Sequence, residues 1–244
     1  MKDYLQDLVQ HTHGLGIIDL IKITGTAEET AVNAVGNEKV VILEAKFKKA
    51  HPDFIGTFGM PNLGKLNTIL NIPEYKEDAK LSINKQKNAA GEDVPCGIHF
   101  ENKAGDFKND YRYMDAAIIN DRLKSVKFRG VNWNVDVTPT NASIQRMKFM
   151  ASANSEELTF QSRVEGNDLK FYFGDPSSHA GSFVFQSGVS GTLSKAWAWP
   201  VAAVISILSL PGDKTFKFSD QGASIITVDS GIANYSYIIP AQTK

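Results

Sequence analysis

The pattern of apolar and polar positions predicts four helices among many short strands. The helices are expected at about 2–12, 61–71, 140–153 and 199–209, where apolar residues recur on one helical face. Runs of β-branched and aromatic residues between turn formers predict strands at 20–24, 40–45, 80–83, 158–161, 169–173, 215–218 and 224–228. The fold class predicted from these elements is α+β.

The second and fourth of these helices repeat one another. Their apolar residues correspond at a constant offset of 138 positions (201 − 63, 204 − 66, 208 − 70): Leu63, Leu66 and Leu70 recur as Val201, Val204 and Leu208. Prolines flank both helices. Pro61 and Pro200 are expected to open them, and Pro73 and Pro211 to end them, because proline has a fixed φ and no N–H.

The first and third helices agree at nearly the same offset. Leu5 and Leu8 correspond to Ile144 and Met147, 139 positions further on (144 − 5, 147 − 8). Two helix pairs that share almost one period predict a duplicated chain. We expect two similar domains, 1–116 and 134–244, each with two helices on antiparallel sheets. A basic stretch with Gly130 predicts an exposed interdomain connector at 117–133.

Composition narrows the class of protein. The 244 residues are 42% hydrophobic and 22% charged, with a formal net charge of −1, as in an ordinary globular protein. This charge excludes a strongly basic nucleic-acid binder, but allows basic residues on one surface. The single cysteine, Cys96, excludes an internal disulfide. Without a signal peptide or a membrane-spanning run, a cytoplasmic location (host cytoplasm if viral) and no membrane partner are expected.

Candidate catalytic and metal sites are weak. No nucleophile elbow, phosphate-binding loop or zinc-protease motif is present, so we expect no enzyme activity, no catalytic residue and no cofactor. His11 and His13 lack a completing acidic or cysteine cluster, which favours a solvated helix end over a metal site. Trp197 and Trp199 could stack on bases from an extended segment, but packing in the core or an interface is favoured.

Taken together, these segments resemble the sliding clamps that tether DNA polymerases to duplex DNA. The resemblance is carried by 66–73 and 204–211, each followed by an alternating strand, by Tyr111–Asp115 before a connector, and by the closing 235–241. The size of the chain is most similar to that of the PCNA-like, trimeric clamps of tailed phages. The resemblance implies a duplicated DNA-clamp fold, three chains closing a ring edge strand to edge strand, and duplex DNA inside. Candidate edges are 108–114 and 182–186.

A DNA channel is the first site that the resemblance implies. Its helices would present cations to phosphates without reading sequence. The residues assigned to it are Lys2, Lys65, Lys76, Arg146, Lys148 and Lys214. For any one lysine alone, a solvated helix face is the simpler interpretation.

A docking pocket for polymerase and clamp-loader peptides is the second. The residues assigned to it, from the connector and the tail, are Ile118, Ile119, Leu123, Ile238, Ile239 and Pro240. Ordinary core packing is an equally simple interpretation of each. The function expected is a homotrimeric processivity clamp. The alternative is a β-rich virion structural protein of the tail or baseplate, which would not need a basic bore.

Overall fold

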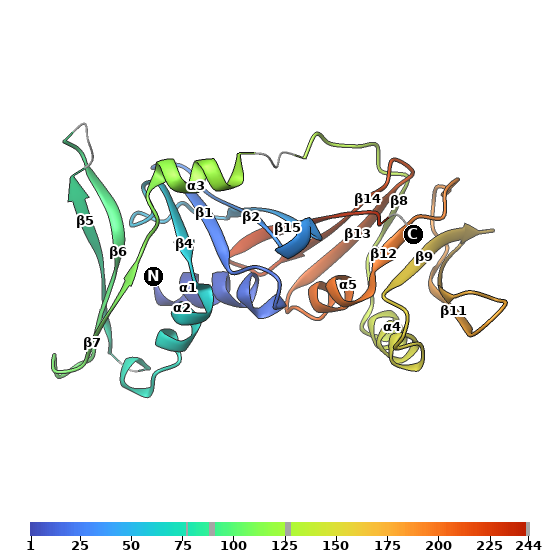
Figure 1. The fold of residues 1–244 in the computed structure, drawn as a ribbon, viewed down its shortest axis with the longest axis horizontal. Helices are drawn as coiled ribbons and strands as arrows, with labels where there is room; N and C mark the ends of the chain where they lie inside the picture. The colour runs from blue at the N-terminus through green and yellow to red at the C-terminus, as the bar shows by residue number, and fades with distance from the viewer. Residues whose placement is uncertain (77, 88–90, 125–127, 243–244) are drawn as a thin grey trace. The chain divides into compact units, whose positions relative to one another are not determined.

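The computed structural model describes residues 1–76, 78–87, 91–124 and 128–242, and divides the chain into two compact units. The first unit comprises 1–39, 43–127 and 230–235. The second comprises 40–42, 128–229 and 236–244. Both are mixtures of helices and antiparallel strands (Figure 1). The α+β class predicted from the sequence is confirmed. The division at 116 and 134 stays a prediction.

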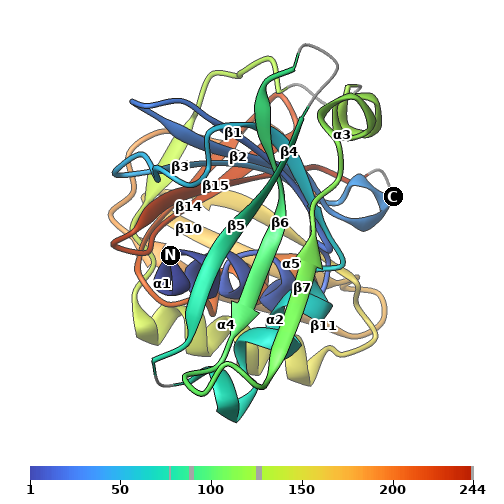
Figure 2. The same ribbon diagram turned by 90° about the vertical axis from the view of Figure 1, so that its left-hand side faces the viewer.

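In the residues that the structure describes, the first unit holds two groups of strands and three α-helices. Strands are ordered β4-β1-β2-β3 in one group and β5-β6-β7 in the other, and the paired registers of β1–β2, β1–β4, β5–β6 and β6–β7 are antiparallel. Figure 2 shows the second group in front. The elements are α1 (Lys2–Gln10), η1 (His13–Leu15), β1 (Leu20–Gly25), β2 (Thr30–Val35), η2 (Asn37–Lys39), β3 (Ile42–Phe47), β4 (Gly56–Pro61), α2 (Leu63–Leu70), η3 (Pro73–Tyr75), β5 (Lys80–Lys87), β6 (Asp93–Glu101), β7 (Lys108–Arg112) and α3 (Ala116–Leu123).

The second unit repeats this plan with two α-helices. Its strands are ordered β11-β10-β9-β12 in one group and β15-β14-β13-β8 in the other. The first three residues of β15 belong to the first unit. The elements are β8 (Val135–Val137), α4 (Asn141–Ala153), β9 (Thr159–Glu165), β10 (Asp168–Gly174), β11 (Ala180–Ser187), β12 (Ala198–Pro200), α5 (Val201–Leu208), β13 (Asp213–Ser219), β14 (Ala223–Asp229) and β15 (Ala233–Pro240).

The repeated apolar stripe is buried in both units, as the sequence predicts. On α2 and α5 the six corresponding residues, Leu63, Leu66, Leu70, Val201, Val204 and Leu208, are all buried. The same holds for Leu5 and Leu8 on α1 and for Ile144 and Met147 on α4. Within each unit the two helices pack against each other, α1 with α2 and α4 with α5. The two halves of the chain therefore share the positions of their buried helix residues.

The prolines before the helices act differently from the prediction. Pro61 ends β4, and α2 begins two residues later, after Asn62 in the left-handed region (φ 52°). Pro200 ends β12 and is the N-cap of α5. Neither proline is a first-turn residue. Each stops a strand, because it has no N–H for the ladder, and the helix begins beyond it.

A helix that the sequence analysis did not predict, α3, occupies part of the expected connector. Asp115 caps it, since its side chain accepts a hydrogen bond from the Ala117 N–H (2.8 Å). Ile119 is fully buried and lies against Gly59 of β4, where a β-carbon would come within 3.0 Å of it. Figures 1 and 2 show α3 on the side of the β4-β1 strands opposite α1 and α2. This part of the connector is packed on the first unit.

Phenylalanines from both groups of strands build the core of the second unit. Phe171 of β10 contacts Phe216 and Phe218 of β13, with ring centroids 6.4 and 5.9 Å apart. Trp199 is buried against Phe218, and its Nε1–H donates to Ser162 Oγ (2.8 Å). Edge-to-face contacts of this kind add to the burial of the rings. Core packing of Trp199 is thus confirmed, and it is not available to stack on bases.

A buried polar cluster joins α1 to the start of β15 in the first unit. The Asp7 carboxylate accepts hydrogen bonds from Tyr235 Oη (2.7 Å) and Ser230 Oγ (3.0 Å). His11 Nδ1 lies 3.3 Å from the other carboxylate oxygen, and its ring stacks on Tyr235 at 4.5 Å. His11 is only 1% exposed, so its prediction as a solvated helix-end residue is wrong. The pairing with Asp7, one helical turn earlier, makes this burial possible.

Replacing Tyr235 by phenylalanine tests this cluster. The variant removes one hydrogen bond to a buried carboxylate, which we expect to lower the free energy of unfolding by roughly 1–3 kcal/mol. Tyr4→Phe is the matched control, because Tyr4 contacts Phe47 and His51 through its ring alone among the described residues. Urea unfolding followed by circular dichroism measures both. Equal stability of the two variants would contradict the expectation.

The same cluster predicts a dependence of stability on pH. Burial raises the pKa of Asp7, but the bonds from His11, Tyr235 and Ser230 outweigh it and hold the pKa below 3.8. Folded protein therefore binds this proton less tightly than unfolded protein, so the stabilisation is complete above the ordinary pKa and is lost as the pH falls through the folded pKa. The stability difference between wild type and Asp7→Asn should shrink below about pH 4. A difference that grows on acidification would argue against this.

Candidate nucleic-acid interface

The basic residues assigned to a DNA channel in the first unit lie on or next to its helix pair. Lys65 is exposed on α2, and Lys76 is exposed just beyond η3. Lys2, on the first turn of α1, donates from Nζ to the carbonyl oxygens of Tyr75 (2.6 Å) and Lys76 (2.9 Å). Lys2 thus lies next to the backbone of Lys76, and its two hydrogen bonds join α1 to η3 and the residue that follows it.

The second unit carries its assigned cations on α4 and at the start of β13. Arg146 is exposed and its guanidinium lies 5.5 Å from the centre of the Phe183 ring, while Lys148 is half-buried. Lys214 donates to the Gly212 carbonyl (2.8 Å), and burial lowers its pKa, although Asp213 acts in the opposite direction. Lys214 also lines a hollow of about 490 Å³ with the first residues of α4. Arg146 and Lys214 therefore already contact other residues of the second unit, Phe183 and Gly212 respectively.

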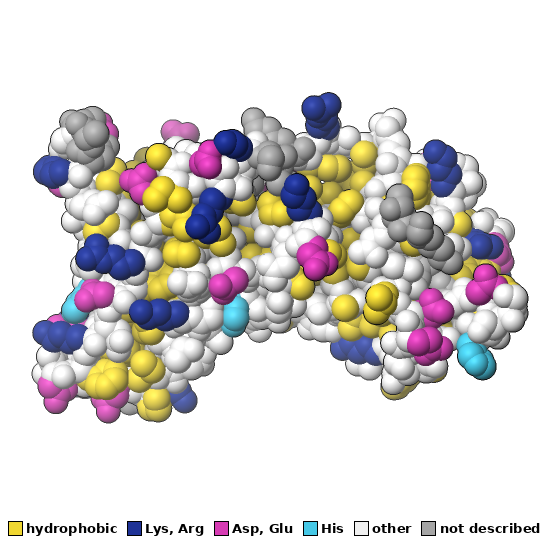
Figure 3. Space-filling view, in the orientation of Figure 1, with side chains coloured by type: hydrophobic (Ala, Val, Ile, Leu, Met, Phe, Trp, Pro, Cys, Tyr) yellow, Lys and Arg dark blue, Asp and Glu magenta, His cyan; other side chains and the backbone are white. Residues whose placement is uncertain are grey.

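Charge on the displayed face is mixed. Figure 3 shows lysine and arginine side chains scattered among aspartates and glutamates over both units. Several lysines are paired with acids, such as the exposed Lys108 with Glu101 at 3.0 Å and the half-buried Lys170 with Glu165 at 2.8 Å. Exposed pairs of this kind contribute little to stability, and they reduce the free positive charge. The helix-face cations Lys65 and Arg146 form no salt bridge among the described residues.

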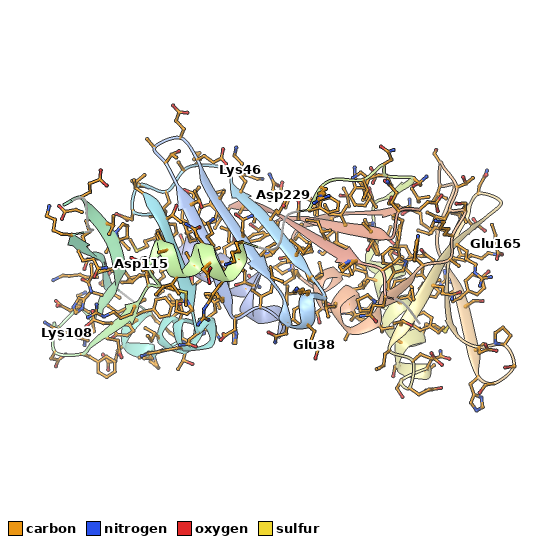
Figure 4. The ribbon with its side chains drawn as sticks, turned by 45° about the horizontal axis from the view of Figure 1, so that its top comes forward. Glu38, Lys46, Lys108, Asp115, Glu165 and Asp229 are labelled. Carbon is orange, nitrogen blue, oxygen red and sulfur yellow. The ribbon has the colours of Figure 1, made fainter. Side chains whose placement is uncertain are left out.

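The residues assigned to a docking pocket are divided between the two units. On α3, Ile118 is 53% exposed, Ile119 is fully buried and Leu123 is half-buried. Figure 4 marks the start of this helix at Asp115. Of this set, Ile118 is the residue of α3 that a ligand could reach directly.

The tail contributes mostly buried residues. Ile238 and Ile239 of β15 are 2% and 0% exposed, and Pro240 is exposed. Beyond Pro240, the Gln242 N–H donates to the Ala198 carbonyl (2.9 Å), which anchors the tail to β12. Core packing thus accounts for Ile119, Ile238 and Ile239. A docking pocket made by the full set stays a prediction.

An aromatic pair in the expected connector was missed by sequence reasoning. Phe128 and Trp133 stack with ring centroids 6.2 Å apart and an interplanar angle of 29°, and both are half-buried. Two large aromatics within six residues of a polar stretch were the available signal. They present apolar surface next to the connector, of the kind that a short peptide binds. Residues 125–127, between α3 and this pair, lie outside the described part of the chain.

One strand in the first unit has peptide groups that point away from its sheet. The N–H of Tyr113, just past β7, donates to the Cys96 carbonyl of β6 (2.9 Å). The next residue, Met114, turns its N–H and C=O to Gly59 of β4 (2.8 and 2.9 Å). Peptide groups of successive residues in an antiparallel strand face opposite sides. The residues of β7 that lie two, four and six positions before Met114 therefore point their peptide groups outward from β6.

These outward residues are Lys108, Asp110 and Arg112. β7 is the last strand in the order β5-β6-β7, so their peptide groups form an open edge within the described sheet. The second unit has a corresponding edge in β11, the last strand of β11-β10-β9-β12, with α4 packed against it. Figure 4 labels Lys108 at the beginning of the first edge. The two segments proposed from sequence as edges, 108–114 and 182–186, thus fall on or next to edge strands.

Neither a metal centre nor a membrane span emerges from the geometry. Among the described residues, no three His, Cys, Asp or Glu side chains are grouped so that they could hold a metal ion. His13 lies 3.7 Å from Asp19, and no third ligand joins them. In the same part of the chain, no helix is long and apolar enough to cross a membrane.

Solved structures with the same fold identify the architecture. No family model matches the chain, and no curated protein matches its sequence. PCNA of A. fulgidus, solved with the C-terminal region of FEN-1, matches with a TM-score of 0.72 and 11% identity over 100% of this chain and 96% of that one. PCNA of Thermococcus kodakaraensis gives 0.68 and 12%, over 99% and 97%. The PCNA2–PCNA3 complex of Sulfolobus tokodaii gives 0.65 and 9%, over 100% and 96%.

These matches cover both units, so the duplicated clamp fold predicted from the sequence is confirmed. At 9 to 12% identity the likeness concerns the fold and does not assign a function. The phage-like subtype is not tested by it.

Removing the cap of α3 tests how firmly this helix is formed. Asp115→Ala deletes the acceptor for the Ala117 N–H, and we expect the free energy of unfolding to fall by about 1 kcal/mol. Asp121→Ala is the control, since Asp121 is an exposed residue of the same helix whose one ion pair within the described residues is with Lys124. Hydrogen exchange of the α3 amides provides a local measurement. Unchanged protection in Asp115→Ala would contradict the capping role.

Proposed function

We propose that this protein is a non-enzymatic sliding clamp, which closes into a homotrimeric ring around duplex DNA and tethers a replicative polymerase. The observation that carries the proposal is the match of the whole chain to the clamp fold at a TM-score of 0.72. A fold can host several functions, so surfaces suited to this one are also needed. The relevant surfaces are the two edge strands and the helix faces.

Ring closure is supported by the two open edges. A two-unit chain with an edge strand such as β7 in one unit and β11 in the other can join copies head to tail, and such heterologous contacts close into rings when the rotation permits. The outward peptide groups of β7 can form a ladder with those of β11 from another copy. Three copies give six similar units. The solved PCNA2–PCNA3 complex is itself an assembly of clamp chains.

DNA contact is assigned to the helix faces. Lys65 and Arg146 are exposed cations on α2 and α4, without salt bridges in the described chain, and Lys2, Lys76, Lys148 and Lys214 lie on or next to elements of the same two units. A few cations per chain attract phosphates without a base-specific contact, and a ring can then move along the duplex. The near-neutral net charge of −1 fits weak attraction rather than tight binding.

Partner docking is assigned to the connector and tail. The A. fulgidus protein was solved with the C-terminal region of FEN-1, so one clamp of this fold binds a terminal peptide. In the first unit Ile118 is exposed on α3, and in the second unit Phe128 stacks on Trp133. We extend peptide docking, by a polymerase and a clamp loader, to apolar residues of this kind. The phage-like subtype belongs to the same proposal.

Charge removal from α4 tests the DNA contact. Arg146→Ala with Lys148→Ala should weaken binding to a short duplex and reduce the salt slope by roughly 0.9 for each phosphate that is no longer neutralised. Arg163→Ala with Lys170→Ala is the charge-matched control on strands of the same unit. Fluorescence anisotropy over a salt series gives the slope. If the α4 variant keeps the wild-type slope, these residues do not face DNA.

Blocking an edge strand tests ring closure. Arg112→Pro removes an outward N–H from β7 without breaking a bond to β6, so the unit should fold while assembly weakens by roughly tenfold or more. Arg112→Ser retains the N–H and is the matched control. Sedimentation velocity should give a trimer for wild type and control, and a monomer for the proline variant. A wild-type monomer at high concentration would instead favour a different function, such as the virion component considered from sequence.

A further inference from the structure

A pocket between α1 and α2 is lined mainly by amide and apolar side chains. It encloses about 320 Å³ in the first unit, and its lining residues are Gln6, Val9, Gln10, His13, Gly14, Asn67, Leu70 and Asn71. Val9 and Leu70 are buried and form an apolar floor, while Gln6, Gln10 and Asn71 are exposed. We call this site the amide pocket. Its lining contains no lysine, arginine, aspartate or glutamate among the described residues.

Two of its amides are free to bind a ligand. Within the described chain, the side chains of Gln6 and Gln10 make no hydrogen bond. Asn71 Nδ2 donates to the carbonyl and side-chain oxygens of Asn67 (2.8 and 3.0 Å), which fixes both amides at the rim. Each amide retains groups that can donate or accept. The pocket therefore offers several N–H donors around an apolar floor.

The two helices beside the pocket do not add their dipoles there. Lys2 at the start of α1 reaches the residues beyond α2, and His13 beyond α1 touches Gly64 at the start of α2, so the helices are antiparallel. Their dipoles oppose one another. Asp19 also caps the first turn of α2, where its Oδ1 accepts from the Gly64 N–H (3.1 Å). A ligand here is held by hydrogen bonds and shape, while Lys2 and Lys65 lie outside the pocket.

The internal repeat indicates that the fold does not require these amides. At the offsets of the two helix pairs, Gln6 corresponds to Gln145 and Gln10 to Phe149 (145 − 6, 149 − 10). Asn67 corresponds to Ile205 and Asn71 to Ser209 (205 − 67, 209 − 71). The buried stripe is common to both units, but three of these four amides are specific to the first. Their presence calls for a reason other than folding.

We propose that the amide pocket binds one sugar–phosphate segment of duplex DNA through neutral hydrogen bonds. Amide N–H groups are common partners of phosphate oxygens, and a deoxyribose can pack on Val9 and Leu70. This inference rests on the proposed clamp function and specifies one of its DNA contacts. Because no ion is displaced by the pocket itself, the contact adds affinity with little salt dependence. It thereby differs from the contacts of Lys65 and Arg146.

Nuclear magnetic resonance of the full chain tests the proposal directly. Adding a short DNA duplex should shift the side-chain amide signals of Gln6, Gln10, Asn67 and Asn71. The amides of Asn33 on β2 and Gln86 on β5 are controls in the same unit and should not move. Inorganic phosphate alone should leave the pocket signals in place. If phosphate shifts them equally, the pocket is a simple anion site and the proposal is overturned.

A variant separates hydrogen bonding from charge. Gln6→Ala with Gln10→Ala removes two exposed amides that make no bond in the described fold, so the helix should remain intact. Duplex affinity should fall roughly two- to tenfold at every salt concentration, with an unchanged salt slope. Lys65→Ala is the comparison and should lower the slope.

The outcomes distinguish this inference from the function on which it rests. If the duplex shifts signals of Arg146 and Lys148 but none in the pocket, the amide contact is wrong and the clamp proposal stands. If no signal anywhere responds to the duplex, the clamp proposal fails and the amide contact with it. Wild-type affinity in the Gln6→Ala, Gln10→Ala variant would also overturn the amide contact.

Discussion

Burial of one apolar stripe per helix is the interaction on which the rest of the structure depends. Each unit has a pair of helices of 8 to 13 residues, too short to be stable alone in water. Leu63 and Leu66 in one unit, and Val201 and Val204 in the other, supply the burial that makes these helices form. The constraint acts on one face only. It leaves the opposite face free to carry whatever chemistry function requires.

The same constraint explains why the open edges can coexist with a stable fold. In the second unit, α4 packs against β11, so the edge strand is held from one face by Arg146, Met150 and their neighbours. In the first unit, Met114 ties the chain just beyond β7 to β4 through two backbone bonds. An edge held in this way keeps its peptide groups in register for a partner, whereas a loose edge would invite unspecific pairing.

Sequence reasoning recovered what depends on periodicity and missed what depends on long-range partners. The stripes at 63–70 and 201–208 were predictable because a helix with three or four apolar positions on one face has few other solutions. His11 was not, because its burial needs Asp7 and Tyr235, 228 positions apart. The short α3 was concealed by its mixed composition. Its cap, Asp115, and buried Ile119 are ordinary residues whose role appears only beside Gly59.

The candidate site residues are harder to predict than the core, because binding residues on a surface do not recur at a fixed spacing along the chain. The basic residues of the helices predicted Lys65 and Arg146 as channel residues, yet they could not reveal that Lys2 also holds η3 through two carbonyls. A search for basic residues could not find the amide pocket, because its described lining has no lysine or arginine. Under the proposed clamp function, strong ionic contacts alone would hinder movement along DNA, since each one adds a barrier to displacement. Under the same proposal, neutral donors such as Gln10 would add contact without adding charge, and the first unit carries amides at positions where the second has Phe149, Ile205 and Ser209.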